Sequence, residues 1–225
     1  MKKIEVRNLS VEITRRCNMR CPHCMRGDAQ DVDISHVFIN DLFSKIGYIN
    51  YFTITGGEPS MNVNGIRYIL RCLKKWNIKV YKFYIITNGS RSSILKPFID
   101  ICAALYDYQQ AKELAPDDKM LQMSNDKYHD ESFQEKVFKK LSQYPFFGNR
   151  FKNTDNYFLI KQGRSKSGNE MPAFSPYIAY DNVVTGDIYL NALGYIIEGG
   201  DLSYENQDSN ILTTPKRIIN YLISL

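Results

Sequence analysis

The sequence predicts an α/β fold, and three observations carry this prediction. Apolar, β-branched stretches of strand length alternate with stretches whose apolar residues recur at helical spacing. The intervening segments have the length of right-handed crossovers, which place successive strands parallel in one sheet. The polar and glycine-rich motifs follow directly after strands, and parallel sheets carry their chemistry at those strand ends.

Five strands and four helices are expected before residue 165. The strand patterns cover 4–13, 50–55, 79–87, 119–124 and 156–161. The helix patterns cover about 34–47, 62–76, 92–106 and 131–143. Together they predict a parallel α/β core over residues 1–165.

A different pattern follows Gly163. Short stretches at 183–201 resemble one or two β-hairpins, and a last helix is expected at 215–224. We therefore expect residues 166–225 to form a short hairpin and helix extension, packed on the core as one structural unit. The polar loops at 107–118 and 162–176 are expected to be the most mobile.

Length and composition fit a globular protein that folds without disulfide bonds. The 225 residues contain 44% hydrophobic and 24% charged side chains, close to the usual balance. A chain of this length buries roughly 70 to 75% of its unfolded surface. No apolar run reaches the about 18 residues of a membrane span, and the alternating start differs from a signal peptide. We expect a cytoplasmic protein with no membrane partner.

The charge pattern gives no reason to expect a nucleic-acid partner. The formal net charge of +5 comes from 29 basic and 24 acidic residues. The excess is scattered, and the lysine pairs at 74–75 and 139–140 fall on predicted solvated helix faces.

Three of the five cysteines crowd into eight residues as Cys17, Cys21 and Cys24. Three thiolates on one loop can converge on a metal centre but leave a four-ligand set incomplete. With a [4Fe-4S] cluster, one iron stays open to bind a substrate or cosubstrate. A structural zinc site completed by His23 or His36 is the alternative. The other two, Cys72 and Cys102, lie on apolar helix faces and are expected to be small buried hydrophobes.

This cysteine spacing resembles that of the radical S-adenosylmethionine (radical SAM) enzymes. Their signature is C-x3-C-x2-C after the first strand, usually with an aromatic residue before the third cysteine, a position held here by His23. Their second motif follows the second strand and is present as Gly56, Gly57, Glu58 and Pro59.

Further matches extend the resemblance over most of the chain. They are similar to motifs of the peptide-modifying and molybdopterin-type branches of this family. They are the Thr-Asn-Gly at 87–89, the Ser-x-Asp-x-x-His-Asp pattern at 124–130, and Gly163 with Arg164. The resemblance implies a partial (βα)6 barrel, similar to an incomplete TIM barrel.

The resemblance also implies an enzyme that uses a [4Fe-4S] cluster and SAM. In such enzymes the open iron chelates SAM, and one electron breaks the sulfur–C5′ bond to give a 5′-deoxyadenosyl radical. That radical abstracts a hydrogen atom from the substrate, while the protein supplies placement and excludes side reactions. An exposed low-potential cluster implies oxygen sensitivity and a flavodoxin- or ferredoxin-type electron donor.

The site residues follow from the matched motifs. The three loop cysteines are the expected metal ligands. The resemblance implies that Gly56 and Gly57 permit close backbone approach and that the turn offers the carboxylate of Glu58 to the SAM ammonium. His23 and Pro59 are also expected to contact the cofactor. Asn88, Ser124 and Asp126, at strand ends, are expected to bind the ribose hydroxyls, and Arg164 is expected to pair with the methionyl carboxylate.

Two departures bear on the substrate. The segment 187–201 resembles the start of the extension that binds auxiliary clusters in peptide-modifying relatives, yet no cysteine follows Cys102, so no auxiliary cluster is expected. The chain begins almost at its first strand, so recognition of a peptide would need a separate protein or the loops.

Three functions remain open. The favoured one is hydrogen abstraction from a peptide or protein. The same chemistry on a small molecule or nucleotide, as in the deazaguanine-forming branch, is the second. A non-catalytic metal-binding protein is the third, although structural sites are normally closed.

Overall fold

The computed structural model describes residues 3–111, 119–124, 128, 131–150 and 159–225. The strands are β1 (Ile4–Glu12), β2 (Ile46–Thr55), β3 (Lys79–Thr87), β4 (Leu121–Met123), β5 (Phe147–Asn149), β6 (Tyr177–Tyr180), β7 (Val183–Leu190), β8 (Ile196–Ile197) and β9 (Ile211–Thr213). The helices are α1 (His36–Phe43), α2 (Val63–Trp76), α3 (Lys96–Tyr108), α4 (Glu131–Leu141), α5 (Tyr204–Ser209) and α6 (Ile218–Ser224). Short 3₁₀ turns occupy Pro59–Met61, Arg91–Ile94 and Pro215–Arg217.

All the strands belong to one sheet with the order β5-β4-β3-β2-β1-β7-β8-β9, and β6 pairs with β7. Strands β1 to β5 run parallel, and β7 runs parallel to β1 on its other side. Strands β6, β8 and β9 are antiparallel to their neighbours. The predicted α/β class with a parallel sheet is confirmed. Within the described residues the sheet is open, as a partial barrel requires.

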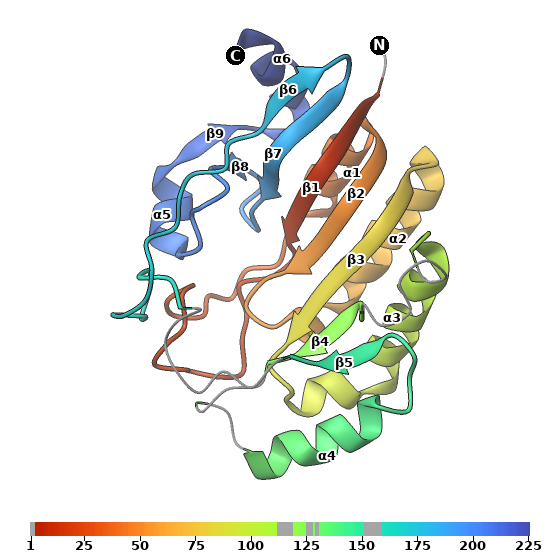
Figure 1. Ribbon diagram of the computed structural model, residues 1–225, viewed down its shortest axis with the longest axis vertical. Coiled ribbons are helices and arrows are strands. Elements are labelled where there is room, and N and C mark those ends of the chain that lie inside the picture. The colour runs from red at the N-terminus through yellow and green to blue at the C-terminus, as the bar shows by residue number, and fades with distance from the viewer. Residues whose placement is uncertain (1–2, 112–118, 125–127, 129–130, 151–158) are drawn as a thin grey trace.

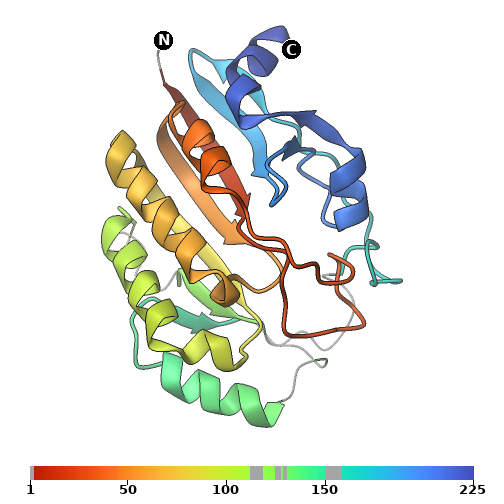
Figure 2. The same cartoon turned by 180° about the vertical axis from the view of Figure 1, so that it is seen from behind.

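The two faces of the central strands have different surroundings. Helices α1, α2 and α3 cover one face (Figure 2). Figure 1 looks onto the opposite face of β1, β2 and β3, which no described helix covers. The burial pattern agrees, because Phe52 and Ile54 on the helix side are fully buried while Tyr51 on the open side is 39% exposed.

Side-chain caps fix where these helices start and stop, and apolar packing holds them on the sheet. Helix α1 is capped at its N-terminus by Ser35, whose side chain accepts a hydrogen bond from the Val37 amide. Helix α2 is capped at its N-terminus by Asn62, whose side chain accepts from the Gly65 amide, and at its C-terminus by Asn77 in the left-handed conformation. The predicted burial of Cys72 and Cys102 is confirmed, with exposures of 2% and 0%.

Because β1 to β4 are parallel, their carboxyl ends meet at one edge of the sheet, at the lower end in Figure 1. The cysteine loop leaves β1 there, the Gly-Gly-Glu-Pro turn leaves β2, Asn88 follows β3 and Ser124 follows β4. The topology thus brings four separated motifs to one edge.

Several predicted boundaries are wrong. The helix predicted over 34–47 ends at Phe43, because Ile46 already belongs to β2 and pairs with Ile4. Strand β5 was not predicted, since its three residues are too few to show alternation. The first half of the strand predicted over 156–161, residues 156–158, lies outside the described residues. In its second half, Ile160 forms an isolated bridge with Asn169.

The predicted hairpin near 183–201 is confirmed in β7 and β8, which pair antiparallel. The sequence did not indicate that β7 would also lie beside β1 in the same sheet, with Leu9 opposite Ile188. No helix among the described residues is long and apolar enough to span a membrane.

Removing the Phe52 side chain is expected to destabilise the fold strongly. Its ring is fully buried and packs at 5.8 Å from that of Phe43 and 5.4 Å from that of Phe83. We expect Phe52→Ala to lower the free energy of unfolding by about 3 to 5 kcal/mol in urea denaturation of the cluster-free chain. Ile223→Ala, at a 69% exposed position, serves as control and should change it by at most about 0.5 kcal/mol. Equal effects of the two substitutions would contradict the described core.

Candidate active site

The cysteine loop turns sharply at the edge of the sheet. The Cys24 amide donates to the Cys21 carbonyl at 3.2 Å, and the Gly27 amide donates to the Cys24 carbonyl at 3.3 Å. Gly27 takes a φ of +94°, a conformation that favours glycine. Cys17, Cys21 and Cys24 are all half-buried and none of them forms a disulfide.

The Cys17 sulfur lies at the junction of this loop with β3. It accepts hydrogen bonds from the Met19 amide at 3.4 Å and from Asn88 Nδ2 at 3.8 Å. Burial raises the pKa of the Cys17 thiol, and the Met19 amide opposes that shift. Asn88 Nδ2 also donates to Asn18 Oδ1 at 3.0 Å. Asn88 is thus placed against the cysteine loop, and its expected contact with a ribose stays a prediction.

The donor set fits a [4Fe-4S] cluster. The site offers three half-buried sulfur ligands, one of which accepts N–H hydrogen bonds of the kind that tune cluster sulfurs. The described residues contain no group of three or more His, Cys, Asp or Glu side chains that could hold a single metal ion. His36, considered above as a zinc ligand, instead stacks on Tyr68 with ring centroids 3.9 Å apart. Ligands on separate irons of a cluster do not need to converge on one point.

His23 lies between the second and third cysteines and stacks on Tyr128, with ring centroids 4.0 Å apart and an interplanar angle of 18°. The imidazole therefore takes part in an aromatic contact within the chain, and its expected contact with the cofactor stays a prediction. Tyr128 belongs to the 124–130 segment, so this pair joins the cysteine loop to the segment after β4.

The Gly-Gly-Glu-Pro turn is laid directly against the chain that leads into Cys17. The Gly57 amide donates to the Thr14 carbonyl and the Glu58 amide to the Arg16 carbonyl, each at 2.8 Å. A Cβ atom at Gly56 would lie 2.3 Å from the Thr14 oxygen, and one at Gly57 would lie 2.3 Å from the Arg16 oxygen. Only glycine permits this approach, so the turn fixes where the cysteine loop begins.

Glu58 connects this turn to the end of β3. Its buried carboxylate accepts from Thr87 Oγ1 and from the Asn88 amide, both at 2.8 Å, and from the Ser60 amide at 3.1 Å. Burial raises the pKa of the Glu58 carboxyl, and these donors oppose the shift. Pro59 opens the 3₁₀ turn that Glu58 caps. The expected contact of Glu58 with the SAM ammonium stays a prediction, because the described contacts are all within the chain.

The other expected site residues lie beside the same edge. The Ser124 amide donates to the Thr87 carbonyl at 2.9 Å, and Asp126 falls outside the described residues. Arg164 donates from Nε to the Cys21 carbonyl at 3.0 Å and from its amide to the Cys24 carbonyl at 2.9 Å. Its guanidinium also pairs with Asp28. Arg164 therefore braces the cysteine loop, and its pairing with a methionyl carboxylate remains a prediction.

A buried charge network beside the loop was missed in the sequence. Arg15 is fully buried and donates to Glu12 at 3.0 Å and to both carboxylate oxygens of Asp208 at 2.7 and 3.2 Å. It also donates to Gln207 at 3.1 Å, and its guanidinium lies 4.5 Å from the ring centroid of Tyr204. Helix α5 in the C-terminal segment thus holds the residue two positions before Cys17.

Arg26, two positions after Cys24, forms the other half of this network. It donates to the Leu202 carbonyl at 3.1 Å and to Thr55 Oγ1 at 3.2 Å, and it lies 3.5 Å from Glu12. The Arg26 carbonyl accepts from the Tyr204 amide. Both ends of the cysteine loop are therefore tied to residues 202–208. Only the composition of the tail, with two acids and two amides at 205–208, hinted at this.

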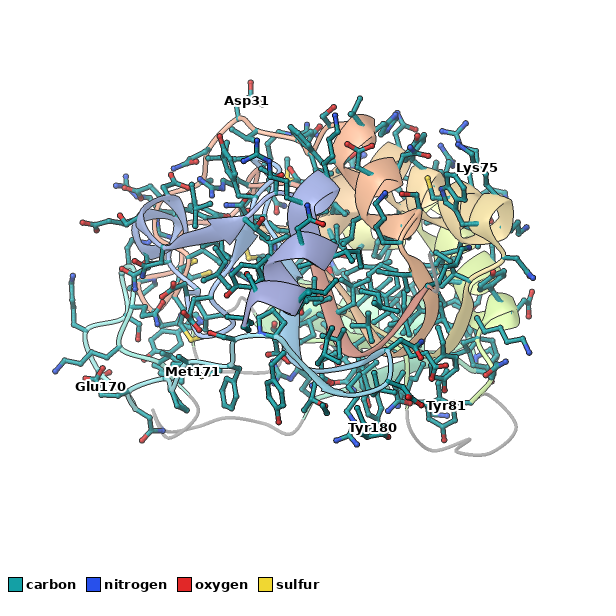
Figure 3. All side chains as sticks on the ribbon, turned by 90° about the horizontal axis from the view of Figure 1, so that it is seen from above. Asp31, Lys75, Tyr81, Glu170, Met171 and Tyr180 are labelled. Atoms are coloured by element: carbon teal, nitrogen blue, oxygen red, sulfur yellow. The ribbon has the colours of Figure 1, made fainter. Side chains whose placement is uncertain are left out.

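The open face of the sheet carries a polar cavity of about 400 Å³, within the range of ligand pockets. It is lined by Asn8, Ser10, Tyr51, Thr53, Tyr84 and Asp187, which belong to β1, β2, β3 and β7. Partial burial raises the pKa of the Asp187 carboxyl, and a hydrogen bond with Asn8 opposes that shift. Figure 3 shows Tyr81 and Tyr180 projecting on this same side.

Comparison with known proteins gives a family and a fold. The family model described as the Radical SAM superfamily matches residues 11–144. A solved structure described as native anSMEcpe with bound AdoMet and Cp18Cys peptide is similar to this chain, with 11% identity and a TM-score of 0.56 over 98% of this chain and 80% of that one. Another, described as native anSMEcpe with bound AdoMet and Kp18Cys peptide, has 10% identity and a TM-score of 0.48 over 97% and 80%. None of the curated proteins matches.

Substitution of Asp208 is expected to loosen the cysteine loop. Asp208→Asn removes the carboxylate that pairs with the buried Arg15 guanidinium and leaves Glu12 as its acidic partner. We expect a loss of about 1 to 3 kcal/mol in the free energy of unfolding, because the Asp208 side chain is partly exposed. Reconstituted protein should also lose iron to a chelator faster than wild type.

Asp201→Asn is the matched control, because Asp201 lies in the same segment and its side chain accepts an exposed hydrogen bond from Asn210. It should change stability by at most about 0.5 kcal/mol and leave iron release unchanged. If the two variants release iron at the same rate, the network does not support the loop.

Proposed function

The chain belongs to the radical SAM superfamily and is an enzyme that uses a [4Fe-4S] cluster and SAM, and we propose that it abstracts a hydrogen atom from a peptide or protein. The observation that carries the proposal is the juxtaposition at one sheet edge of the three-cysteine loop and the Gly-Gly-Glu-Pro turn, beside a polar cavity on the open face.

Cys17, Cys21 and Cys24 would hold the cluster, which leaves one iron without a protein ligand. Bound together, cluster and SAM supply the radical that removes hydrogen from an unactivated carbon. Gly56 and Gly57 let the turn lie close to the loop, and Glu58 fixes Asn88 beside Cys17. These contacts set the loop geometry before any cofactor binds.

Arg164 and Ser124 are proposed to line the SAM site together with Asn88. All three are held at the sheet edge by backbone or side-chain contacts, so a ligand bound there would meet them without reordering the chain. His23, stacked on Tyr128, adds a flat aromatic surface on the loop.

The cavity on the open face supports a peptide substrate. Its lining combines two tyrosines with hydroxyl, amide and carboxylate groups, which suits a ligand with both apolar and hydrogen-bonding parts. The one carboxylate, Asp187, would favour a substrate group that donates hydrogen bonds or carries positive charge. The peptide-bound neighbour of similar fold makes peptides the first substrate class to test.

The cluster assignment predicts which cysteines matter. After anaerobic reconstitution with iron and sulfide, wild type treated with dithionite and SAM should form 5′-deoxyadenosine, and the Cys17, Cys21, Cys24→Ala variant should form none. Cys72→Ala removes a buried thiol of the core and should keep deoxyadenosine formation. Product formation by the triple variant would exclude these cysteines as the cluster ligands.

The substrate class is tested by deuterium transfer. Cell extract from a culture grown in deuterated medium is separated into peptide and small-molecule fractions, and each is supplied to the reconstituted enzyme. We expect deuterium in 5′-deoxyadenosine from the peptide fraction. Asp187→Asn should reduce this transfer while leaving dithionite-driven SAM cleavage unchanged, because Asp187 lies in the proposed substrate cavity. Transfer from the small-molecule fraction alone would favour the small-molecule or nucleotide alternative.

A further inference from the structure

The helix side of the molecule carries a groove that is rich in positive charge. A cavity of about 550 Å³ lies against α1, α2 and α3, and its lining includes Arg67, Arg71 and Lys74 together with His36. The three basic residues are spaced four and three positions apart and so form one stripe along α2. All three are exposed. We call this cavity, together with a second cavity that continues it, the basic groove.

A second cavity continues the basic groove toward the cysteine loop. It has a volume of about 360 Å³ and shares His36 and Asn64 with the first. Its lining also includes Arg16, the residue directly before Cys17. Figure 2 shows that α2 begins at the same end of the sheet as the cysteine loop. The groove therefore leads from the outer surface of α2 to the neighbourhood of the cluster ligands.

The positive charge of the stripe is not neutralised within the described chain. Helix α2 contains no acidic residue, and none of the ion pairs of the described residues involves Arg67, Arg71 or Lys74. The acidic lining residue Asp33 is itself paired with Arg16 at 2.6 Å. The groove thus presents a surplus of positive charge to solvent.

The basic groove lies away from the proposed substrate cavity. In Figure 3, Lys75 at the end of α2 lies on the helix side, while Tyr81 and Tyr180 project on the opposite, open side. A protein bound in the groove would leave the open face accessible. It would also lie beside Arg16, whose backbone continues directly into Cys17.

We propose that the basic groove docks the electron donor, an acidic low-potential carrier protein of the flavodoxin type. This inference rests on the proposed function, because only a cluster that must be reduced needs such a partner. One electron leaves the reduced carrier, which is oxidised by one electron, and enters the cluster, which is reduced by one electron. No bond is formed or broken. Carboxylates around the carrier's flavin complement the arginine and lysine stripe and steer the encounter.

The first test measures binding without the cluster. The cluster-free chain is titrated with oxidised flavodoxin by calorimetry at low and at high salt. Wild type should bind at low salt and lose affinity at high salt. Replacing Arg67, Arg71 and Lys74 by Glu should weaken binding by about tenfold or more. The same three residues replaced by Ala should give a smaller loss in the same direction.

The matched control places the same charge change elsewhere. Glu replaces Lys136, Lys139 and Lys140, which are exposed on α4. This variant should bind flavodoxin within about twofold of wild type, because a docking patch depends on local charge more than on net charge. Equal losses in the two Glu variants, or no binding by wild type, would overturn the proposal.

The second test compares two reductants on the reconstituted enzyme. With reduced flavodoxin, the α2 Glu variant should form 5′-deoxyadenosine about tenfold more slowly than wild type. With dithionite, which needs no docking surface, the two should match. An equal defect with both reductants would show that the α2 residues support the cluster and would overturn the docking role. Absence of SAM cleavage by wild type with dithionite would count against the proposed function, while the binding measurement would still decide the docking.

Discussion

The architecture of this site depends on a buried ion pair between Glu12 and Arg15, at the point where β1 ends and the cysteine loop begins. Both side chains are fully buried, so neither charge can be satisfied by water, and each must keep its partners. Those partners come from distant parts of the chain, including Asp208 from α5 and Arg26 from the far end of the loop. Satisfying these charges therefore forces the tail and the loop into contact with the strand.

Contacts on both sides of the cysteine loop explain how an open sheet can hold this loop in one conformation. On one side, Gly57 lets the turn after β2 rest on the backbone before Cys17. On the other, Arg164 binds the carbonyls inside the loop. The C-terminal segment, which resembles the start of a cluster-binding extension yet carries no cysteine, contributes hydrogen bonds and charge to the main site. Strand β7 of this segment pairs with β1, which makes the segment part of the same sheet.

Local sequence predicted the fold class and the edge of the sheet that carries the site, because strand and helix periodicity and turn motifs are local signals. The motifs at Cys17 and Gly57 were recognisable for the same reason. The network around Arg15 joins residues about 190 positions apart, as the separation of Arg15 and Asp208 shows, and no local pattern reports such a contact. Strand β7 was read as part of a hairpin only, since its pairing with β1 depends on the tertiary arrangement. Arg164 was assigned to a ligand on the basis of the resemblance, whereas its described contacts brace the loop.

The central claim is that this chain holds the cysteine loop in place before any cofactor binds. Hydrogen exchange of the cluster-free protein, resolved to single amides, tests it most directly. Four amides report on the loop. The Arg15 amide donates to the Val32 carbonyl and the Gly57 amide to the Thr14 carbonyl. The Glu58 amide donates to the Arg16 carbonyl and the Arg164 amide to the Cys24 carbonyl. The account predicts that these amides are protected to a degree comparable with the amides of β1. Exchange of these four amides at the rate of an unfolded chain, while β1 stays protected, would contradict it and show that the loop forms only around its cluster.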